Sequence, residues 1–561
     1  MILDKIIFLI IIFLKIFLFP TSQSTDFEVH RNWKAITNTL PISEWYFYSD
    51  NKWTLDYPPL FAYMEYILGK VSKYFDPNIT NINKFDYDSK ECKIFLRTTV
   101  LLGDIFLFFS INFLYKALSL SFIKYCVLLF SIQFYSGLVI IDNIHFQYNG
   151  ILFGLLLISI GFISKKKYIY GAIFYFILLF MKHIFIYFAP AYFLFYLQYI
   201  IINNIKKKKY GYLIKNVILI GLSFCLVIII TFLPFIVISI RDKSFEQLIQ
   251  IKDRLFPVQR GLLHTYWAPN FWALYSFVDK ILYFSYSKRI PFFKEITNFL
   301  LKYKENKNMN VKKNISSLGS SESGVSKETG FDVLPNIDMK MTNLIIIIFI
   351  IIYYIKYFCF WSTKTKKEKI KNKKIKEFIK HSICFNLIFF NFGYQVHEKA
   401  FLNISILTMI YYIVAVHKEK LLIINKGKEE IKEKKYFSNA LTKLAFPIVI
   451  EGIFAQLPLI HVAKDYMVKL GLTLFYIFIS KAIMFNKRII IITIFTMFYV
   501  VISLILDFLI SFQDYFAFDS KFILFVILNG IKKRYSFLYT MLFSVNNAIL
   551  TQIIFAILLI F

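Results

Sequence analysis

Cysteine, glycine and proline are scarce in this sequence. Its 561 residues include 5 cysteines, 18 glycines and 13 prolines. The cysteines show no paired spacing, and all but Cys92 lie in or beside apolar runs. This pattern excludes a disulfide framework and a zinc site. The low glycine and proline content accompanies a drift towards Ile, Phe and Tyr, and it indicates no function.

Acidic residues are also few. The chain has 35 Asp and Glu against 66 Lys and Arg, a net charge of +31. Such an excess can indicate nucleic-acid binding, but here the lysines cluster at the ends of apolar runs. Basic residues in that place orient membrane proteins. The charge therefore predicts membrane topology and no nucleic-acid partner.

Hydrophobic residues make up 58% of the chain, and the mean hydropathy is +0.58. A soluble protein is excluded. The apolar residues come in runs of about 20, the length that crosses a bilayer as a helix. We therefore predict an all-α polytopic membrane protein with about 14 transmembrane helices. The runs are 6–20, 95–118, 122–141, 150–164, 168–181, 184–203, 214–240, 342–361, 378–392, 401–416, 440–459, 465–484, 489–511, 520–531 and 536–560.

The basic clusters assign the two sides of the membrane. Lys165–Lys167 and Lys206–Lys209 should be cytosolic, which places Asp142–Gly150 and Arg241–Trp272 in the lumen. The stretch Ile6–Pro20 fits a cleaved signal peptide or a retained first helix, and both put the next loop in the lumen. The predicted divisions are a first membrane helix (1–20), a luminal loop with the catalytic base (21–94), transmembrane helices (95–240), a long luminal loop (241–341) with an interfacial helix and a disordered polar insertion (302–327), and C-terminal transmembrane helices (342–561).

The polar clusters other than the lysine runs all fall on the luminal side. A single His or Asp at a helix end is usually a cap or an interface residue. Several such clusters on one side are harder to explain in that way, because ionisable groups at membrane depth usually line a cavity. The clusters are Asp26–Glu28, Thr54–Pro59, Asp142–Asn149, Lys182-His183, Arg254–Asn270 and His397–Lys399.

These segments carry a family resemblance. The chain resembles the dolichyl-phosphate-glucose-dependent α-1,3-glucosyltransferases of the endoplasmic reticulum, from the first loop to about residue 416. Beyond that point only hydrophobicity is recognisable. Of the two sister enzymes, which add the first and second glucose to the lipid-linked oligosaccharide, it is more similar to the second. The segments concerned are Ser24–Trp33, Leu40–Tyr46, Trp53–Pro59, Asp142–Gly150, Arg260–Leu262, His264–Leu274 and Val396–Ala400. Asn143 and the insertion 302–327 depart from the family pattern.

The resemblance implies a GT-C-type fold whose luminal loops carry the active site, in a multi-pass protein of the endoplasmic reticulum membrane. It implies dolichyl-phosphate-glucose as donor, a dolichyl-pyrophosphate oligosaccharide of the Glc1Man9GlcNAc2 type as acceptor, contact with membrane lipids, and no cofactor. A first-glucose transferase, an enzyme for a truncated mannose acceptor and a transporter of a lipid-linked sugar remain alternatives. A transporter predicts internal repeats, and none is found in the sequence.

The chemistry requires one base and a set of cations. A carboxylate must take the proton of the acceptor hydroxyl, and Asp26 is our choice, as the first luminal acid and by the resemblance. Glu28 is held in reserve. Hydrogen-bond donors must stabilise the departing phosphate, and His397, Lys399, Arg260, Lys182 and His183 suit that role.

Other polar and aromatic residues of the same segments are predicted to bind substrate, namely Arg31, Trp33, Asp56, Tyr57, Asp142, His145, Gln147, Asn149, His264, Trp267 and Glu398. No metal is required. Asp86-Tyr87-Asp88 has the spacing of metal-dependent nucleotide-sugar transferases, but it lies in a loop without a nucleotide-binding sheet, so chance explains it better.

Overall fold

A computed structural model of the chain describes residues 2–256, 262–263, 268–287, 291–306, 331–361, 373–415, 440–484, 490–512 and 538–560. Within these ranges the chain is helical, and the extended contacts reduce to one isolated bridge between Leu263 and Val396. The longer helices are α1 (Ile2–Ile16), α2 (Thr25–Thr39), α3 (Pro59–Ser72), α4 (Lys90–Leu118), α5 (Phe122–Gln133), α7 (Asn149–Ser164), α8 (Tyr168–Met181), α9 (Ala189–Tyr196), α11 (Tyr210–Arg241), α12 (Glu246–Leu255), α13 (Phe271–Ser287), α14 (Pro291–Asn306), α15 (Met339–Trp361), α16 (Lys373–Phe392), α17 (Phe401–Ala415), α20 (Ala445–Phe454), α21 (Tyr466–Met484), α22 (Ile490–Phe512) and α24 (Leu538–Ile560).

The all-α multi-pass prediction is confirmed. In the described residues, nine helical segments are long and apolar enough to cross a membrane, and three shorter apolar helices accompany them. The count of about 14 stays a prediction, and the predicted run at 520–531 lies outside the described residues.

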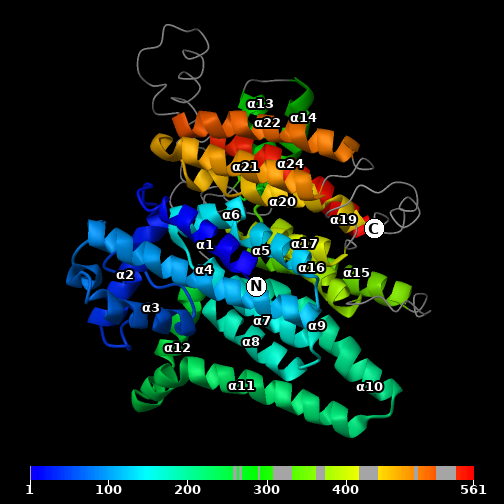
Figure 1. Cartoon of the computed structure of the whole chain (residues 1–561). Coiled ribbons are helices and arrows are strands. Elements are labelled where there is room, and N and C mark those ends of the chain that lie inside the picture. The colour runs from blue at the N-terminus through cyan, green and yellow to red at the C-terminus, as the bar shows by residue number, and fades with distance from the viewer. Residues whose placement is uncertain are drawn as a thin grey trace.

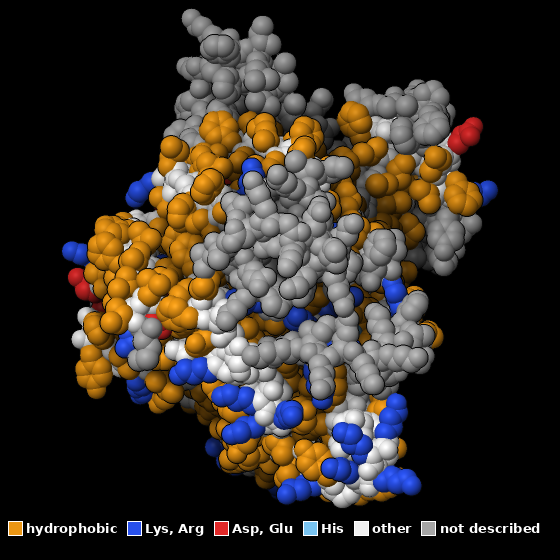
Figure 2. Space-filling view, turned by 45° about the vertical axis from the view of Figure 1, so that its right-hand side comes forward, with side chains coloured by type: hydrophobic (Ala, Val, Ile, Leu, Met, Phe, Trp, Pro, Cys, Tyr) orange, Lys and Arg blue, Asp and Glu red, His pale blue; other side chains and the backbone are white. Residues whose placement is uncertain are grey.

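The helices are arranged with two distinct ends. In Figure 1 most of them run side by side across the picture, with α2, α3 and α12 at the left. The connection from α10 (Asn203–Lys206) to α11 lies at the right. Figure 2, which brings the right-hand side forward, shows Lys and Arg side chains gathered on the lower part of that face. The predicted cytosolic cluster Lys206–Lys209, which forms the α10–α11 connection, thus lies at the end of the molecule opposite α2 and α3 (Figure 1).

One predicted span continues further than expected. The run 122–141 was expected to end before Asp142, because a carboxylate normally leaves the bilayer. Instead α5 and the short helix α6 (Ser136–Val139) lead into a π-helix, η2 (Ile140–Phe146). Asp142 remains buried there because the side-chain amide of Asn149 and the backbone amide of Gly150 donate to it, at 2.7 and 2.8 Å. π-turns of this kind are frequent at functional sites.

The start of α7 is held very close to α4. A Cβ added at Gly150 would come within 3.2 Å of the backbone carbonyl of Gly103. A side chain at position 150 would push the two helix backbones apart by a few tenths of an ångström, which glycine avoids. The contact fixes the Asn149 end of α7 beside η2.

The first helix is joined to α4 by a buried ion pair. Nζ of Lys15 donates to Asp104 at 2.6 Å, and both residues are buried. Asp104 also accepts from the side chain of Asn143 at 3.2 Å. Asn143, which departs from the family pattern, is therefore part of this buried hydrogen-bond network.

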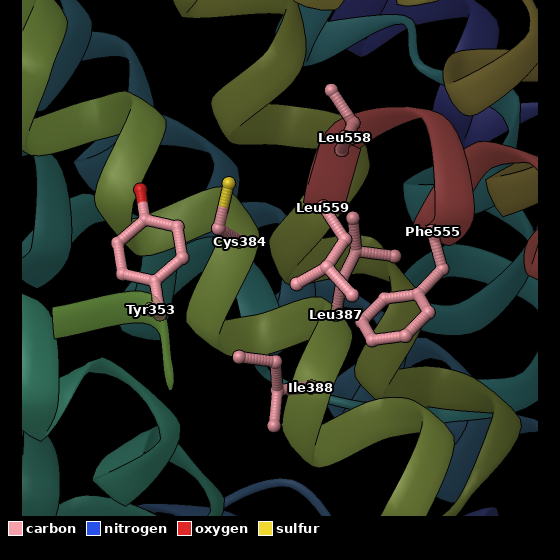
Figure 3. Close-up of a pocket in the computed structure, with 7 residues that line it drawn as sticks. All are labelled: Tyr353, Cys384, Leu387, Ile388, Phe555, Leu558 and Leu559. Atoms are coloured by element: carbon pink, nitrogen blue, oxygen red, sulfur yellow. The ribbon is translucent and has the colours of Figure 1, made fainter. Parts of the chain in front are cut away.

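The C-terminal helices complete the packed core. Figure 3 shows Tyr353, Cys384, Leu387, Ile388, Phe555, Leu558 and Leu559 lining a small hollow where α15, α16 and α24 meet. Its volume of about 10 Å³ leaves no room for a substrate. A larger apolar hollow of about 260 Å³ lies between α1, the α5–α6 segment and α21.

The long loop begins with α12 and continues with α13, a helix over the segment for which an interfacial helix was predicted. α13 packs on α24 through Ala273 and Ala548. α14 extends to Asn306, so residues 302–306, which were predicted to be disordered, are helical. The remainder of that insertion lies outside the described residues.

Candidate active site

Helix α2 presents Asp26 in its first turn. The helix follows Ser24, whose hydroxyl donates to the backbone carbonyl of His145. A carboxylate in the first turn is favoured by the partial positive charge of the helix N-terminus. The N-terminus of α2 therefore places Asp26 beside the end of the π-helix.

One oxygen of Asp26 lies close to three nitrogen atoms from distant parts of the chain. Oδ2 lies 2.6 Å from Nζ of Lys399, 2.6 Å from Nε2 of Gln147 and 3.3 Å from Nε2 of His145. No described residue donates to Oδ1. The two oxygens thus differ: Oδ2 is held in place, and Oδ1 is available to a substrate.

These contacts set the charge of the carboxylate. Burial alone would raise the pKa of Asp26, but the charge and the hydrogen bond of Lys399, together with the nearby imidazole of His145, outweigh it. The pKa of Asp26 consequently lies well below its ordinary value. The group is ionised near neutral pH, and it is a weak base while Lys399 contacts it.

A second cation is linked to Asp26 through Gln147. Nζ of Lys182 donates to Oε1 of Gln147 at 3.1 Å and lies 5.0 Å from the centre of the Tyr57 ring. Oε1 of Gln147 also accepts from Asn149 at 3.0 Å, and Asn149 in turn donates to Asp142. Burial and the nearby charge of Lys399 lower the pKa of Lys182 to about 8, although Asp26, Asp142 and Asp56 act in the opposite direction.

Lys399 stands on a 3₁₀ turn, η9 (Glu398–Ala400), which begins directly after His397. The turn is supported from the C-terminal part of the chain, because the amide of Gln456 donates to the carbonyl of Glu398 at 3.0 Å. The side chain of Glu398 is buried and acts electrostatically on His145. The long loop also reaches this region, since the backbone amide of Gln395 donates to the carbonyl of Leu262 at 3.0 Å.

Several predicted site residues have structural partners instead. Glu28 forms a two-point ion pair with Arg31, at 2.6 and 2.8 Å. Arg31 also donates to the carbonyls of Ile79 and Asn81, and it is fully buried. These contacts fix the loop after α3 and leave Glu28 poorly suited to act as a base.

Two further predicted residues have partners outside the hydrogen-bonded network of Asp26. The indole of Trp33 donates to the carbonyl of Thr54 at 3.0 Å and packs on Tyr57. The ring of His183 packs on Phe256, and its Nδ1 has no hydrogen-bond partner among the described residues. His183 is thus adjacent to Lys182 in sequence but makes none of its contacts with the Asp26 cluster.

Arg260, His264 and Trp267 were also predicted to bind substrate or phosphate. All three lie outside the described residues.

A buried polar group beside the cluster was not predicted from the sequence. Lys34 pairs with Glu65 at 2.6 Å, and His30 contacts the other oxygen of Glu65 at 2.6 Å. A signal was present, because Asp26, His30 and Lys34 are spaced four apart and so share one face of a helix. Arg97 was missed as well; it donates to the carbonyls of Asn143 and Ser22 and so joins α4 to both sides of the site.

The arrangement suits acid–base chemistry with an anionic leaving group. It offers one carboxylate with a free oxygen and two lysines within the same hydrogen-bonded network. Within the described residues, no group of three or more His, Cys, Asp and Glu side chains is arranged to hold a metal ion.

Comparison with known proteins gives a consistent result. The model of the ALG6, ALG8 glycosyltransferase family matches residues 11–427. A Saccharomyces cerevisiae protein named dolichyl pyrophosphate Glc1Man9GlcNAc2 alpha-1,3-glucosyltransferase is 38% identical over 410 residues, 70% of this chain and 67% of that protein. The Mus musculus protein of the same name is 36% identical over 71% of this chain and 70% of its own length. A Drosophila melanogaster protein with the same name, qualified as probable, is 31% identical over 83% of this chain and 78% of its own length.

Proposed function

The chain belongs to the ALG6, ALG8 glycosyltransferase family, and we propose that it adds the second glucose to the lipid-linked precursor of N-glycans. It is a dolichyl-linked α-1,3-glucosyltransferase, in keeping with the names of its relatives. Its acceptor is a dolichyl-pyrophosphate oligosaccharide of the Glc1Man9GlcNAc2 type. The donor is dolichyl-phosphate-glucose, and the reaction takes place on the luminal side of the endoplasmic reticulum membrane.

The reaction needs a base at the acceptor hydroxyl. Oδ1 of Asp26 takes the proton of the 3-hydroxyl of the terminal glucose while that oxygen attacks C1 of the donor glucose. The bond from C1 to the phosphate oxygen breaks, and dolichyl phosphate leaves with the electron pair. One such displacement converts a β-linked donor into an α-linked product, so no covalent enzyme intermediate is required.

Lys399 and Lys182 stabilise the departing phosphate, with His397 beside them. Preorganised cations aimed at growing negative charge are among the strongest contributions to catalysis. Lys399 contacts Asp26 at 2.6 Å in the substrate-free protein. The donor phosphate competes for that ammonium group, and as Lys399 turns towards the phosphate, the pKa of Asp26 rises and the base becomes stronger. Donor binding thereby prepares the base.

The observation that carries this proposal is the meeting of the nitrogens of Lys399, Gln147 and His145 on Oδ2 of Asp26 with Oδ1 left open. Glu28 is the weaker candidate for the base, because its carboxylate is already paired with Arg31. The remaining predicted substrate residues of the cluster, Asp56, Tyr57, Asp142 and Asn149, surround the sugar rings or orient Gln147 and Lys182.

The proposed divisions of the chain agree with this site. We infer that α2, α3 and α12 lie in the lumen, since they gather at one end of the molecule, opposite the α10–α11 connection (Figure 1). The long loop 241–341 belongs to the same side.

The test is a microsomal transfer assay with dolichyl-phosphate-glucose and lipid-linked acceptors that carry zero or one glucose. We expect transfer to the acceptor with one glucose and a product with two. Transfer only to the acceptor without glucose would identify a first-glucose transferase. Absence of transfer to either acceptor, with the protein present at the normal level, would contradict the proposed reaction.

A further inference from the structure

A buried group of side chains that takes no part in the proposed chemistry contacts Tyr148, the residue that follows Gln147. Its centre is Glu65 on α3, whose two oxygens contact Lys34 and His30 of α2, each at 2.6 Å. Nζ of Lys34 also donates to the hydroxyl of Tyr148 at 3.1 Å, and the Tyr148 hydroxyl lies 2.8 Å from that of Thr99 on α4. The group therefore ties three helices to the residue just before α7.

None of these groups is open to a substrate. Lys34 and Glu65 are fully buried, and His30 is 2% exposed. Burial lowers the pKa of His30 despite the neighbouring carboxylate of Glu65, so the imidazole is neutral near pH 7. Burial opposes the charge on Lys34 as well, but Glu65 outweighs it and raises the pKa of Lys34. Lys34 and Glu65 thus form a charged pair inside the protein, which requires well-placed partners to persist.

The segment that this group contacts has an unusual backbone. Phe146 has a φ of 82°, a region that large side chains rarely occupy. Its ring is surrounded by Phe27, His30 and Tyr148, with centroid distances of 5.3, 5.4 and 5.4 Å. The packing of these rings offsets the strain and holds the turn in place.

Gln147 lies between the two anchored aromatic residues. Its own side chain accepts from Lys182 and donates to Asp26. Asp26 stands one helical turn before His30 on α2. The proposed base and two residues of the buried group, His30 and Lys34, therefore belong to the same helix. The distance from Gln147 to Asp26 is consequently fixed from both sides.

We propose that His30, Lys34, Glu65 and Tyr148 are positioning residues, which hold the strained Phe146 turn so that Gln147 keeps Asp26 linked to Lys182. The inference rests on the proposed function, because it assigns the group a role through a residue of that site. It predicts that the group affects the rate only as long as Gln147 has its amide side chain.

The test is a double-mutant cycle between Tyr148→Phe and Gln147→Ala in the full chain. Tyr148→Phe removes one hydroxyl and keeps the ring. We expect it to lower kcat about tenfold with little change in either KM, because misplacement of a group near the reacting atoms acts on the transition state. With Gln147→Ala already present, the added Tyr148→Phe should change kcat less than about twofold.

A matched control is available in Tyr192. It is 2% exposed like Tyr148, and its hydroxyl likewise lies against another hydroxyl, that of Ser159 at 2.6 Å. Tyr192→Phe should have the same effect with and without Gln147→Ala. If Tyr148→Phe lowers kcat equally in both backgrounds, the group has no specific connection to Gln147 and the proposal is wrong.

A second measurement does not depend on transfer activity. Hydrogen–deuterium exchange of the purified chain should be faster for the amides of residues 140–150 in Tyr148→Phe, and unchanged in Tyr192→Phe. Unchanged exchange in this segment would overturn the positioning role even if the parent protein transferred glucose. Failure of transfer by the parent protein, with faster exchange in Tyr148→Phe, would instead overturn the proposed function. Glu65→Gln is less suitable, because it leaves the charge of Lys34 without a counter-charge and is expected to reduce the yield of folded protein.

Discussion

Asp26 presents its two carboxylate oxygens to different surroundings. Oδ2 lies within 3.3 Å of three nitrogen atoms, whereas no described residue donates to Oδ1. A carboxylate fixed in this way loses little freedom when an acceptor hydroxyl binds, because its orientation is already set. Side-chain variants at this position therefore separate the chemical role from a purely local structural one.

Asp26→Asn should retain the fold and nearly abolish transfer. The amide keeps the size and the polarity of the side chain but cannot accept the hydroxyl proton, and loss of a general base lowers the rate by roughly a hundredfold to ten-thousandfold. The measurement is kcat in microsomes at matched protein level.

The control for that variant is Asp88→Asn, which changes an exposed carboxylate just before α4 whose ion pair among the described residues is with Lys93. It should transfer glucose at the parent rate. If Asp26 served only to stabilise the start of α2, the asparagine variant would be nearly neutral. A near-parent rate in Asp26→Asn would thus remove it from the catalytic role.

Lys399→Gln should change both the rate and its dependence on pH. Loss of a donor aimed at the leaving phosphate lowers kcat by about a hundredfold. The charge of Lys399 also lowers the pKa of Asp26, so its removal raises that pKa and moves the acidic limb of kcat/KM to higher pH. An unchanged acidic limb would mean that Lys399 does not act on the base. His397→Ala, which removes a neighbouring donor, should lower kcat without moving this limb.

Lys182 gives a prediction at the alkaline side. Its pKa is lowered to about 8, so it is charged below that pH and loses its charge above it. We expect kcat/KM for the donor to fall as the pH rises through about 8 in the parent protein. In Lys182→Arg this fall should be absent, since arginine stays charged. Persistence of the fall in Lys182→Arg would assign it to another group.

Among the helices, α1 is attached to the rest of the fold by a buried charge. Its Lys15 forms a buried ion pair with Asp104 of α4. Removing one partner leaves an uncompensated charge in the protein interior, which typically destabilises by about 3 to 5 kcal/mol. We propose that α1 is retained in the mature protein, since cleavage would remove the partner of Asp104.

Asp104→Asn should therefore lower the melting temperature of the purified protein in detergent, and Lys15→Met combined with Asp104→Leu should recover most of the loss. Asp242→Asn, which breaks the exposed pair with Arg241, should leave the melting temperature unchanged. Equal stability of Asp104→Asn and the parent would contradict the structural role of the pair. A tag at residue 1 that is lost from the mature protein would contradict the retained helix.

The spans were predictable from sequence because each apolar run carries its own signal. The π-helix η2 was not, since Asp142 stays buried only through donors on Asn149 and Gly150, whose positions depend on the packing of α7 against α4. The pairing of Glu28 with Arg31 was visible as a spacing of three residues on one helix, but the spacing alone does not distinguish a structural pair from a catalytic acid.

In the site, too, the residues could be predicted from the sequence but their contacts could not. Asp26 and Lys399 were both named from the sequence, yet they lie 373 positions apart, and only the tertiary fold joins them. The group around Glu65 was missed because α3 carries no polar pattern that points to α2. Its partners are set by the folding of two helices onto each other.

Across the whole molecule, the C-terminal helices support the site although their sequence is recognisable only as hydrophobic. Gln456 donates to the carbonyl of Glu398, and the backbone amide of Ser22 donates to Asp465 at 2.8 Å. Both contacts touch segments that flank the proposed catalytic groups. The C-terminal helices thus stabilise the segments that flank the proposed site, in addition to their place among the membrane helices.

The topology can be checked with inserted tags in sealed microsomes. A tag after Lys208, in the basic α10–α11 connection, should be digested by added protease, and tags after Asp86 and near Ser320 should survive until detergent is added. The tag at Lys208 serves as the control for protease access. Digestion of the tag near Ser320 without detergent would put the long loop, and Arg260 with it, on the other side.

The pairing of Lys15 with Asp104 also sets an order of events while the chain is being made. The two residues are 89 positions apart, so at typical rates of synthesis Lys15 emerges roughly 5 to 20 s before its partner. During that interval Lys15 lacks the carboxylate with which it later pairs. An unpaired lysine within a membrane helix is energetically unfavourable. The contact between α1 and α4 can therefore form only after α4 has been synthesised, so α1 reaches its paired position later than it is made.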